Sequence, residues 1–357
     1  SSNLLLNAKL PTSSGYNSMV INAGETENKG IDLTINSTNI TNKNFTWNTS
    51  ITLSHNKNSV KKLTGEDVQL WEANFGYSQN THIIGVNQPL GQMYGYVTDG
   101  LYQVSDFDYD AATKTYTLKD GVPYAGEKGN VKPGMWKFKN IDGSKDNKIT
   151  EADKTVIGNA YPKIYGGINN TFTYKDFDLS IFLTYSIGND VFNATKLTNT
   201  KTALQNKNVL AVADSKHRWV LVNKAGDLIT DPQEMADINK GKTVAAIYDN
   251  EAGDTYIHSW AVEDGSFLKL SNITLGYTFP KKMIRKVGLS KLRLYATGSN
   301  LLTWTKYSGF DPEVSTMGNG LTPGVDFGAY PRSRAFVFGI NFCLLYTSPS
   351  PRDPKTS

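Results

Sequence analysis

The sequence predicts an all-β protein made of antiparallel strands, and it favours a transmembrane barrel over a soluble sandwich. Three observations support this prediction. Apolar and polar residues alternate in many segments, long polar connections separate those segments, and the strand at 336–342 has large apolar residues at every even position. Alternation with a period of two indicates a strand with one apolar face. Outer-membrane barrels are built from such strands and are expected to end on one with a terminal aromatic residue.

The composition is compatible with a barrel and excludes one kind of membrane protein. The 357 residues are 39% hydrophobic, and the mean hydropathy is −0.40. No run of 18 apolar residues occurs, so a helical membrane span is excluded. A barrel is not excluded, because its strands alternate lipid-facing and polar residues and therefore keep the average low.

Charge and cysteine content say little about partners. The net charge of +4 comes from 37 basic and 33 acidic residues scattered along the chain. Without a basic stripe there is no support for nucleic acid binding. The single cysteine is Cys343, so disulfides play no part. The start at Ser1 has neither a methionine nor a charged leader, and we expect it to lie within a longer protein.

The alternating segments follow one another along the chain. The first two are 31–35 and 47–53, each with isoleucine or leucine on one face and serine, threonine, asparagine or aspartate on the other. The clearest is a hairpin around Tyr174-Lys175-Asp176-Phe177, in which the outgoing strand places Phe177, Leu179 and Ile181 on one face. Two more segments, 273–279 and 292–296, flank a short connection with Pro280 and Gly288.

The alternation alone does not separate a barrel from a sandwich, because a sandwich turns the same apolar face to its own core. Aromatic residues near the strand ends fit the interfacial girdles of a barrel: Trp47, Tyr174, Phe177, Tyr185, Tyr277 and Phe279. Long connections at 55–90, 103–135 and 190–255 are uncommon in compact soluble domains and expected in barrels. They favour the barrel.

One motif carries metal chemistry. Residues 142–153 have the spacing of a twelve-residue calcium loop, which supplies hard oxygen ligands at positions 1, 3, 5, 7, 9 and 12. Those positions are held by Asp142, Ser144, Asp146, the Lys148 carbonyl, Thr150 and Asp153. Ile149 would anchor the loop through its apolar side chain. Asn147 replaces the usual glycine at position 6, and position 12 is aspartate instead of glutamate. We expect any calcium here to be structural; the alternative is a polar turn without an ion.

No other motif indicates catalysis. His55, His82, His217 and His258 share no metal-ligand spacing and are expected at the surface or in loops. No carboxylate pair, phosphate loop or nucleophile elbow stands out. The sequence therefore predicts neither an enzyme nor a redox cofactor.

Several longer strings resemble one family. They are PLGQMYGY at 89–96 with DGLY at 99–102, GMWKFKN at 134–140, TVIGNAYPK at 155–163, EDGSFLKLSNITLGY at 263–277, and GSNLLTW at 298–304 with GFDPEV at 309–314. In this order they resemble the SusC/RagA family of TonB-dependent outer-membrane transporters, over residues 1–342. The family's acidic loop usually has the form Asp-x-Asn-Gly-Asp-Gly, so the loop at 142–153 is a degenerate copy.

The resemblance implies a 22-stranded barrel with an N-terminal plug, of which residues 1–342 would be the C-terminal part, with about ten to twelve strands of about ten residues. It also implies a Gram-negative outer-membrane location in contact with lipid, and import of oligosaccharides or peptides. A SusD-like lipoprotein would cap the barrel. The TonB–ExbB–ExbD system would act through an N-terminal region missing from this chain.

The segment 343–357 differs from everything before it. Its start, Cys343-Leu344-Leu345-Tyr346-Thr347-Ser348-Pro349, resembles translated sequencing-adapter read-through. We therefore expect 343–357 to be non-native and disordered. The parity of the preceding strand places Phe336, Phe338, Ile340 and Phe342 on the lipid side and predicts an outward residue at 344.

Two points stay open. A secreted β-sandwich that binds glycans through loops and a calcium site is the alternative function, and it requires Phe177, Leu179 and Ile181 to be buried. The residues that bind substrate are not identified. Aromatic residues of the long connections are candidates for stacking on sugars, although packing within the loops explains them as well: Trp71, Phe75, Tyr77 and Tyr248.

Overall fold

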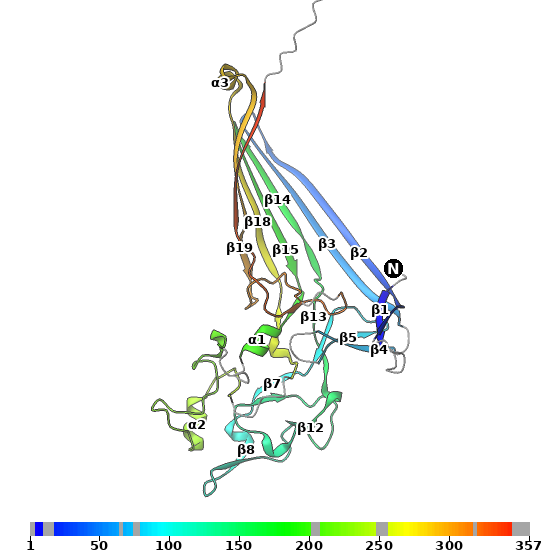
Figure 1. Cartoon of the computed structure of the whole chain (residues 1–357), viewed down its shortest axis with the longest axis vertical. Helices are drawn as coiled ribbons and strands as arrows, with labels where there is room; N and C mark the ends of the chain where they lie inside the picture. Colours follow the sequence, from blue (N-terminus) through cyan, green and yellow to red (C-terminus); the bar gives the residue numbers. More distant parts are fainter. Residues whose placement is uncertain are drawn as a thin grey trace, which may run out of the picture.

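The protein consists of one large antiparallel sheet and a lobe of small sheets and short helices at one end of it (Figure 1). The computed structural model describes residues 4–9, 18–63, 67–73, 79–200, 208–247, 256–316 and 320–344. The all-β fold predicted from the alternation is confirmed. No helix among these residues is long and apolar enough to cross a membrane.

The large sheet has eight strands, and each is antiparallel to its neighbours. In spatial order they are β1 (Leu4–Lys9), β2 (Ser18–Thr41), β3 (Phe45–Leu63), β14 (Ile164–Tyr174), β15 (Phe177–Ile187), β18 (Phe267–Thr278), β19 (Leu289–Thr305) and β21 (Ala335–Leu344). Among the described residues β1 and β21 are the two edges and do not pair with each other, so the sheet is open.

Short connections join the strands at the end of the sheet away from the lobe. Lys175 turns the predicted hairpin between β14 and β15 with a left-handed φ of 52°. The Asn42 side chain accepts hydrogen bonds from the backbone N–H groups of Asn44 and Phe45 and closes the turn between β2 and β3. Helix α3 (Lys281–Ile284) connects β18 to β19 at the same end (Figure 1).

The lobe is formed by the long connections. It contains a four-stranded sheet of β13 (Thr155–Asn159), β6 (Gln92–Gly95), β5 (Asn80–Gly85) and β4 (Val68–Glu72), and a three-stranded sheet of β17 (Val262–Asp264), β16 (Asp190–Asn193) and β20 (Val325–Asp326). Three strand pairs complete it: β7 (Thr98–Leu101) with β11 (Trp136–Phe138), β8 (Phe107–Asp110) with β9 (Thr115–Leu118), and β10 (Tyr124–Ala125) with β12 (Lys148–Ile149). Its helices are α1 (Ala194–Asn199) and α2 (Pro232–Ile238).

The buried core lies in the lobe and at its junction with the sheet. The largest cluster gathers around Phe192, Leu197 and Ile257, and another surrounds Trp219. The middle of the large sheet contributes no buried hydrophobic side chain to these clusters. The sheet therefore has an apolar face without a core of its own.

Two expectations about the strands were wrong. The described residues hold eight strands in the large sheet instead of ten to twelve, because β2 and β3 have 24 and 19 residues. Residues 55–63, predicted to begin a loop, extend β3. They stay in the ladder because β2 continues beside them with polar partners, for example Asn28 opposite Asn58.

The predicted boundary of the tail is also displaced. Cys343 and Leu344, predicted to be disordered, belong to β21, where they pair with Lys291 and Leu289. The ladder continues to Leu344 because β19 extends far enough to provide backbone hydrogen-bonding partners. Leu344 is exposed, as the parity of the strand predicts. Residues 345–357 lie outside the described residues, and their non-native origin stays a prediction.

Candidate functional site

The first functional feature is an apolar face that runs across the large sheet. One register row joins Trp47, Phe172, Leu179, Leu275, Ala296 and Phe338 across six strands. Phe338 is 80% exposed and Leu275 is 52% exposed. A soluble fold would cover such a surface, because contiguous exposed apolar patches mark contact with another apolar phase.

The sandwich alternative is contradicted by this exposure. Phe177 is 50% exposed, and Leu179 and Ile181 are only partly covered. No second sheet packs on this face in the described part of the chain. The residues predicted to face outward, Phe336, Phe338, Ile340 and Phe342, are 61–80% exposed, more than Val337 of the opposite face at 51%.

The height of the apolar face matches a bilayer. Eight residues along β15 separate the row of Phe45, Tyr174 and Phe177 from the row of Tyr185 and Trp304. At about 3.4 Å per residue this distance is roughly 27 Å along the strands. With the usual strand tilt of about 40° this is roughly 20 Å of height, close to the apolar band of outer-membrane barrels. Aromatic residues mark both ends, as predicted.

The opposite face of the sheet is polar. Arg293 on β19 pairs with Asp178 on β15, with Nε 3.0 Å from Oδ1. Hydroxyl groups bond across neighbouring strands, as between Thr274 and Thr297 at 2.9 Å. This is the face that the sequence pattern assigned to the inside of a barrel.

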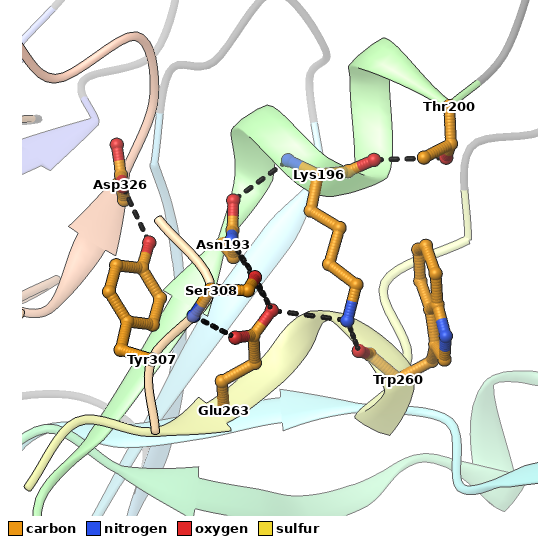
Figure 2. Close-up of polar contacts among 8 residues, drawn as sticks. All are labelled: Asn193, Lys196, Thr200, Trp260, Glu263, Tyr307, Ser308 and Asp326. Carbon is orange, nitrogen blue, oxygen red and sulfur yellow. Dashed lines mark hydrogen bonds and ion pairs between the residues drawn. The ribbon is translucent and has the colours of Figure 1, made fainter. Parts of the chain in front are cut away.

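A second feature, which we call the latch, joins α1, β16, β17 and the end of β19 in the lobe. Figure 2 shows the Glu263 carboxylate at its centre. Glu263 accepts hydrogen bonds from the Ser308 backbone N–H and hydroxyl, each at 2.8 Å, and lies 3.1 Å from Lys196 Nζ. The Asn193 amide adds a bond at 3.3 Å.

The ammonium group of Lys196 in the latch has further partners besides Glu263. Lys196 Nζ donates to the Trp260 carbonyl at 3.1 Å and lies 4.0 Å from the centre of the Trp260 ring. Burial raises the pKa of the Glu263 carboxyl, but the hydrogen bonds from Ser308 and the Lys196 charge outweigh it, so the pKa lies below its usual value. Beside it, Tyr307 donates to Asp326 at 2.5 Å. The latch fixes β16 at the base of the sheet.

A third feature is the clamp, in which the buried Lys269 of β18 holds the connection that follows β19. Lys269 Nζ lies 2.7 Å from Glu313 Oε2 and 3.9 Å from Asp311 Oδ2. Arg332 contacts the same two carboxylates, at 2.9 Å for Asp311 and 3.2 Å for Glu313. The two cations and two anions draw both ends of this connection onto the polar face of the sheet.

Between the polar face, β16 and the clamped connection lies a cavity of about 430 Å³. Tyr165, Thr184 and Ser186 line it from the sheet, Asp190 from β16, and Glu313 from the connection. Burial raises the pKa of the Asp190 carboxyl, and a hydrogen bond from the Asn159 N–H opposes this effect. The latch and the clamp therefore fix two walls of one cavity.

The residues of the predicted calcium loop do form a closed loop, but hydrogen bonds within the protein close it. Asp153 is fully buried and accepts from the backbone N–H groups of Ile141 at 2.7 Å, Asp142 at 3.2 Å and Thr150 at 2.7 Å. Asn147 has the left-handed φ of 55° that position 6 requires. Ile149 is buried, as predicted.

The other predicted ligands lie at the surface of this loop. Asp142 accepts from the Ser144 N–H at 2.7 Å, and Asp146 accepts from the Lys148 N–H at 3.1 Å. The bond from the Lys148 N–H, together with one from the Ser144 side chain, lowers the pKa of Asp146. No group of three or more His, Cys, Asp or Glu residues is arranged for a metal ion in the described residues. Calcium binding stays a prediction.

The prediction for the histidines was wrong for two of the four. His82 and His258 are buried, because strand pairing draws both into the lobe interior, where Thr81 and Thr98 provide polar partners. Among the candidate stacking residues, Trp71 packs against a buried cluster, while Phe75, Tyr77 and Tyr248 lie outside the described residues. Asp190, Glu263 and Glu313 were not predicted as site residues, since no local spacing along the chain marks them.

Comparison with known proteins agrees with this architecture. No family model matches the chain. It is 33% identical over 345 residues to TonB-dependent receptor P3 of Formosa agariphila, covering 95% of this chain and 31% of the relative. It is 27% identical over 343 residues to TonB-dependent receptor SusC of Bacteroides thetaiotaomicron, covering 95% and 28%. The chain thus spans about a third of the length of the curated relatives it matches.

Solved structures show the same fold. The chain resembles the RagAB peptide transporter with a TM-score of 0.64 at 20% identity, covering 94% of this chain and 31% of that one. The "closed-closed" state of the RagAB peptide importer gives a TM-score of 0.62 at 21% identity, covering 95% and 32%.

The open sheet is thus a portion of the wall of a large antiparallel transmembrane barrel. Over 95% of its length the chain is similar to TonB-dependent receptors, SusC among them, and thus resembles the SusC/RagA family. The relatives and neighbours carry the names of receptors and importers, not of enzymes.

Proposed function

We propose that the protein containing this chain imports oligosaccharides or peptides across the outer membrane of a Gram-negative cell. The TonB–ExbB–ExbD system drives the transport, and a SusD-like surface lipoprotein assists it. This chain contributes a part of the lipid-facing wall and a folded lobe. The observation that carries the proposal is the exposed apolar face, with short turns at one end and the lobe at the other (Figure 1).

The membrane orientation follows from the connections. Outer-membrane barrels have short turns on the periplasmic side and long loops on the outside. The ends of β14 and β15 at Tyr174 and Phe177, and α3, then face the periplasm. The lobe, with the latch and the clamp, faces outward and forms part of the mouth of the barrel.

Transport requires a closed barrel with a plug. A suitable protein is a complete receptor in which residues 1–344 replace the aligned segment of the P3 receptor. Uptake of labelled oligosaccharide and peptide mixtures is measured in cells with and without functional TonB. We expect uptake only with TonB. Equal uptake in both cells, or accumulation of the receptor in the soluble fraction, contradicts the proposal.

The lipoprotein partner is tested by its place of contact. A photo-crosslinking residue replaces the exposed Leu228 in the lobe, and a matched one replaces the exposed Met283 in α3. With a co-expressed SusD-like lipoprotein we expect a crosslink from position 228 and none from 283. A crosslink from 283 alone overturns the proposed orientation.

A further inference from the structure

Strands β2 and β3 continue beyond the outer end of the apolar face. The row of Tyr185, which marks that end, reaches β3 at Leu53. β14 pairs with β3 no further than Ser54, whereas β2 and β3 stay paired with each other beyond it. Residues 24–31 of β2 and 55–63 of β3 therefore form a two-stranded extension of the sheet, which we call the outer ribbon.

The two faces of the outer ribbon have different surroundings. On the inner face, Val60 is fully buried in a cluster with residues of the lobe. On the other face, the register is unbroken from Leu33 opposite Leu53 to Lys29 opposite Lys57. Because side chains alternate along a strand, the two lysines lie on the same face as these leucines, two rows further out. They thus continue the lipid-facing wall.

The outward face of the ribbon carries an excess of positive charge. Lys29 and Lys57 are direct partners in the ladder, and like charges directly opposite each other destabilise a sheet. Glu27 lies 2.9 Å from Lys29 through Oε1 and 3.1 Å from Lys61 through Oε2. Both of its oxygens are therefore engaged. The Lys57 side chain has no ion pair or hydrogen bond with the described residues.

The other charged residues of the outer ribbon do not provide a partner for Lys57. Glu25 lies opposite Lys62 in the ladder, so these two charges offset each other. Three lysines then share the single charge of Glu27. An anion from outside this part of the chain would remove the repulsion between Lys29 and Lys57.

The height of the lysine pair corresponds to the headgroup layer of a membrane. Lys57 lies four residues beyond Leu53, about 14 Å along the strand and roughly 10 Å in height at the usual tilt of about 40°. Headgroups extend roughly 5–8 Å beyond the hydrocarbon core on each side. A lysine side chain lays its apolar stem along apolar surface and keeps its ammonium group among polar groups. Both ammonium groups therefore reach the headgroups.

We propose that Lys29 and Lys57 bind the phosphate group of a lipid in the outer leaflet. Ammonium groups bind phosphate through charge-assisted hydrogen bonds. Ile31, in the row between the lysines and Leu33, is 70% exposed, and such an apolar side chain below the cations favours a lipid over an acidic protein segment. The inference rests on the proposed function for the membrane orientation and adds a lipid site outside the transport path.

Equilibrium binding of labelled lipid A to the purified complete receptor in detergent tests this site. We expect lipid A to bind, and dephosphorylated lipid A and inorganic phosphate to compete poorly. A lysine beside an anionic headgroup contributes about fivefold in affinity, so Lys29→Gln combined with Lys57→Gln should weaken binding roughly thirtyfold. Lys57→Gln alone leaves both ion pairs of Glu27 intact and should weaken it about fivefold.

The matched control combines Lys224→Gln with Lys240→Gln, which removes the same charge from exposed positions of the lobe. It should bind lipid A as the unchanged receptor does. The heat-modifiable band of folded barrels checks that all variants fold, and glutamine relieves the repulsion between the strands without shortening the side chains.

Three results overturn the inference. The first is equal binding of lipid A by the lysine variants and the control. The second is competition by dephosphorylated lipid A or by inorganic phosphate as strong as that by lipid A, the latter indicating a site for free phosphate. The third is loss of lipoprotein binding with unchanged lipid binding in the lysine variants, which indicates an acidic protein partner.

The binding assay is independent of transport, because it contains no TonB. Failure of TonB-dependent uptake together with lysine-dependent lipid binding refutes the import function alone. Intact uptake together with lipid binding that does not depend on Lys29 and Lys57 refutes the lipid site alone.

Discussion

His82 is a buried imidazole whose two ring nitrogens both have partners. Its Nε2 donates to the Pro323 carbonyl at 3.0 Å, and Nδ1 accepts from the Thr81 hydroxyl at 2.8 Å. Burial lowers the pKa of His82 from 6.5 to about 4, and the Pro323 bond opposes this only in part. The side chain thus ties β5 to the connection that precedes β20 in its neutral form.

This histidine makes the lobe sensitive to acid. Between pH 6.5 and about 4 the His82 imidazole binds a proton in the unfolded state but not in the folded state. The stability of the lobe therefore falls by roughly 3 kcal/mol at most as the pH is lowered through this window. Above the window it is unaffected by this histidine. Hydrogen exchange of β5 amides in the complete receptor checks this. His82→Gln should remove much of the pH dependence, and the exposed His217→Gln should not.

Asp153 has a comparable role in the loop at 142–153. It accepts three backbone N–H groups, and asparagine leaves at least one of them without an acceptor. We expect Asp153→Asn to destabilise the loop by about 2–3 kcal/mol, measured as faster limited proteolysis. Asp120→Asn, which changes an exposed carboxylate paired only with Lys128, is the control. Equal proteolysis of the two variants contradicts the prediction.

The calcium prediction is tested on the same loop. If Asp142, Ser144 and Asp146 turn their oxygens to an ion, ~1 mM Ca²⁺ should slow exchange of the loop amides, as for weak extracellular sites. The same concentration of Mg²⁺ is the control. Unchanged exchange shows that the hydrogen bonds of Asp153 close the loop without an ion.

At the scale of single elements, β21 has residues of different chemistry on its two faces. Phe338 lies on the apolar face, opposite Ala296. Asn341 lies on the polar face, opposite Arg293. Because side chains alternate, substitutions three residues apart report on different environments.

A charge on the apolar face of β21 should therefore block membrane assembly. Phe338→Asp in the complete receptor exchanges an 80% exposed aromatic side chain for an anion on the lipid side of the strand, at a cost below the roughly 2–4 kcal/mol of an arginine or lysine at the bilayer midplane. Asn341→Asp adds the same charge next to Arg293 and should assemble normally. The readout is the heat-modifiable band of folded barrels in membrane fractions. Equal assembly of both variants argues against lipid contact at Phe338.

At the scale of the whole molecule, the open edges decide what this portion of the barrel does by itself. The described part of β1 and all of β21 pair with only one neighbour each. Unpaired backbone groups at two edges are not tolerated within a bilayer. Residues 1–342 alone should therefore neither insert into liposomes nor transport. A stable, heat-resistant, β-rich species after reconstitution would contradict this prediction.

Much of the fold was predictable because alternation is a local property. A period of two assigns Phe336 and Phe338 to one face and Val337 to the other, whatever surrounds the strand. The girdle aromatics, the hairpin at Lys175, and the left-handed Asn147 follow from equally local rules. The same rules did not predict where β3 ends, because polar residues are as compatible with a paired strand as with a loop.

The sequence by itself determined that the chain is all-β, which strand faces are apolar, and which family it resembles. Tertiary structure alone decided the latch, the clamp, the cavity and the burial of His82. The physical reason is chain separation. His82 and Pro323 are 241 residues apart, and Asn193 and Ser308 are 115 apart. Such contacts depend on the path by which the long connections fold back onto the base of the sheet. No spacing along the chain predicts that path.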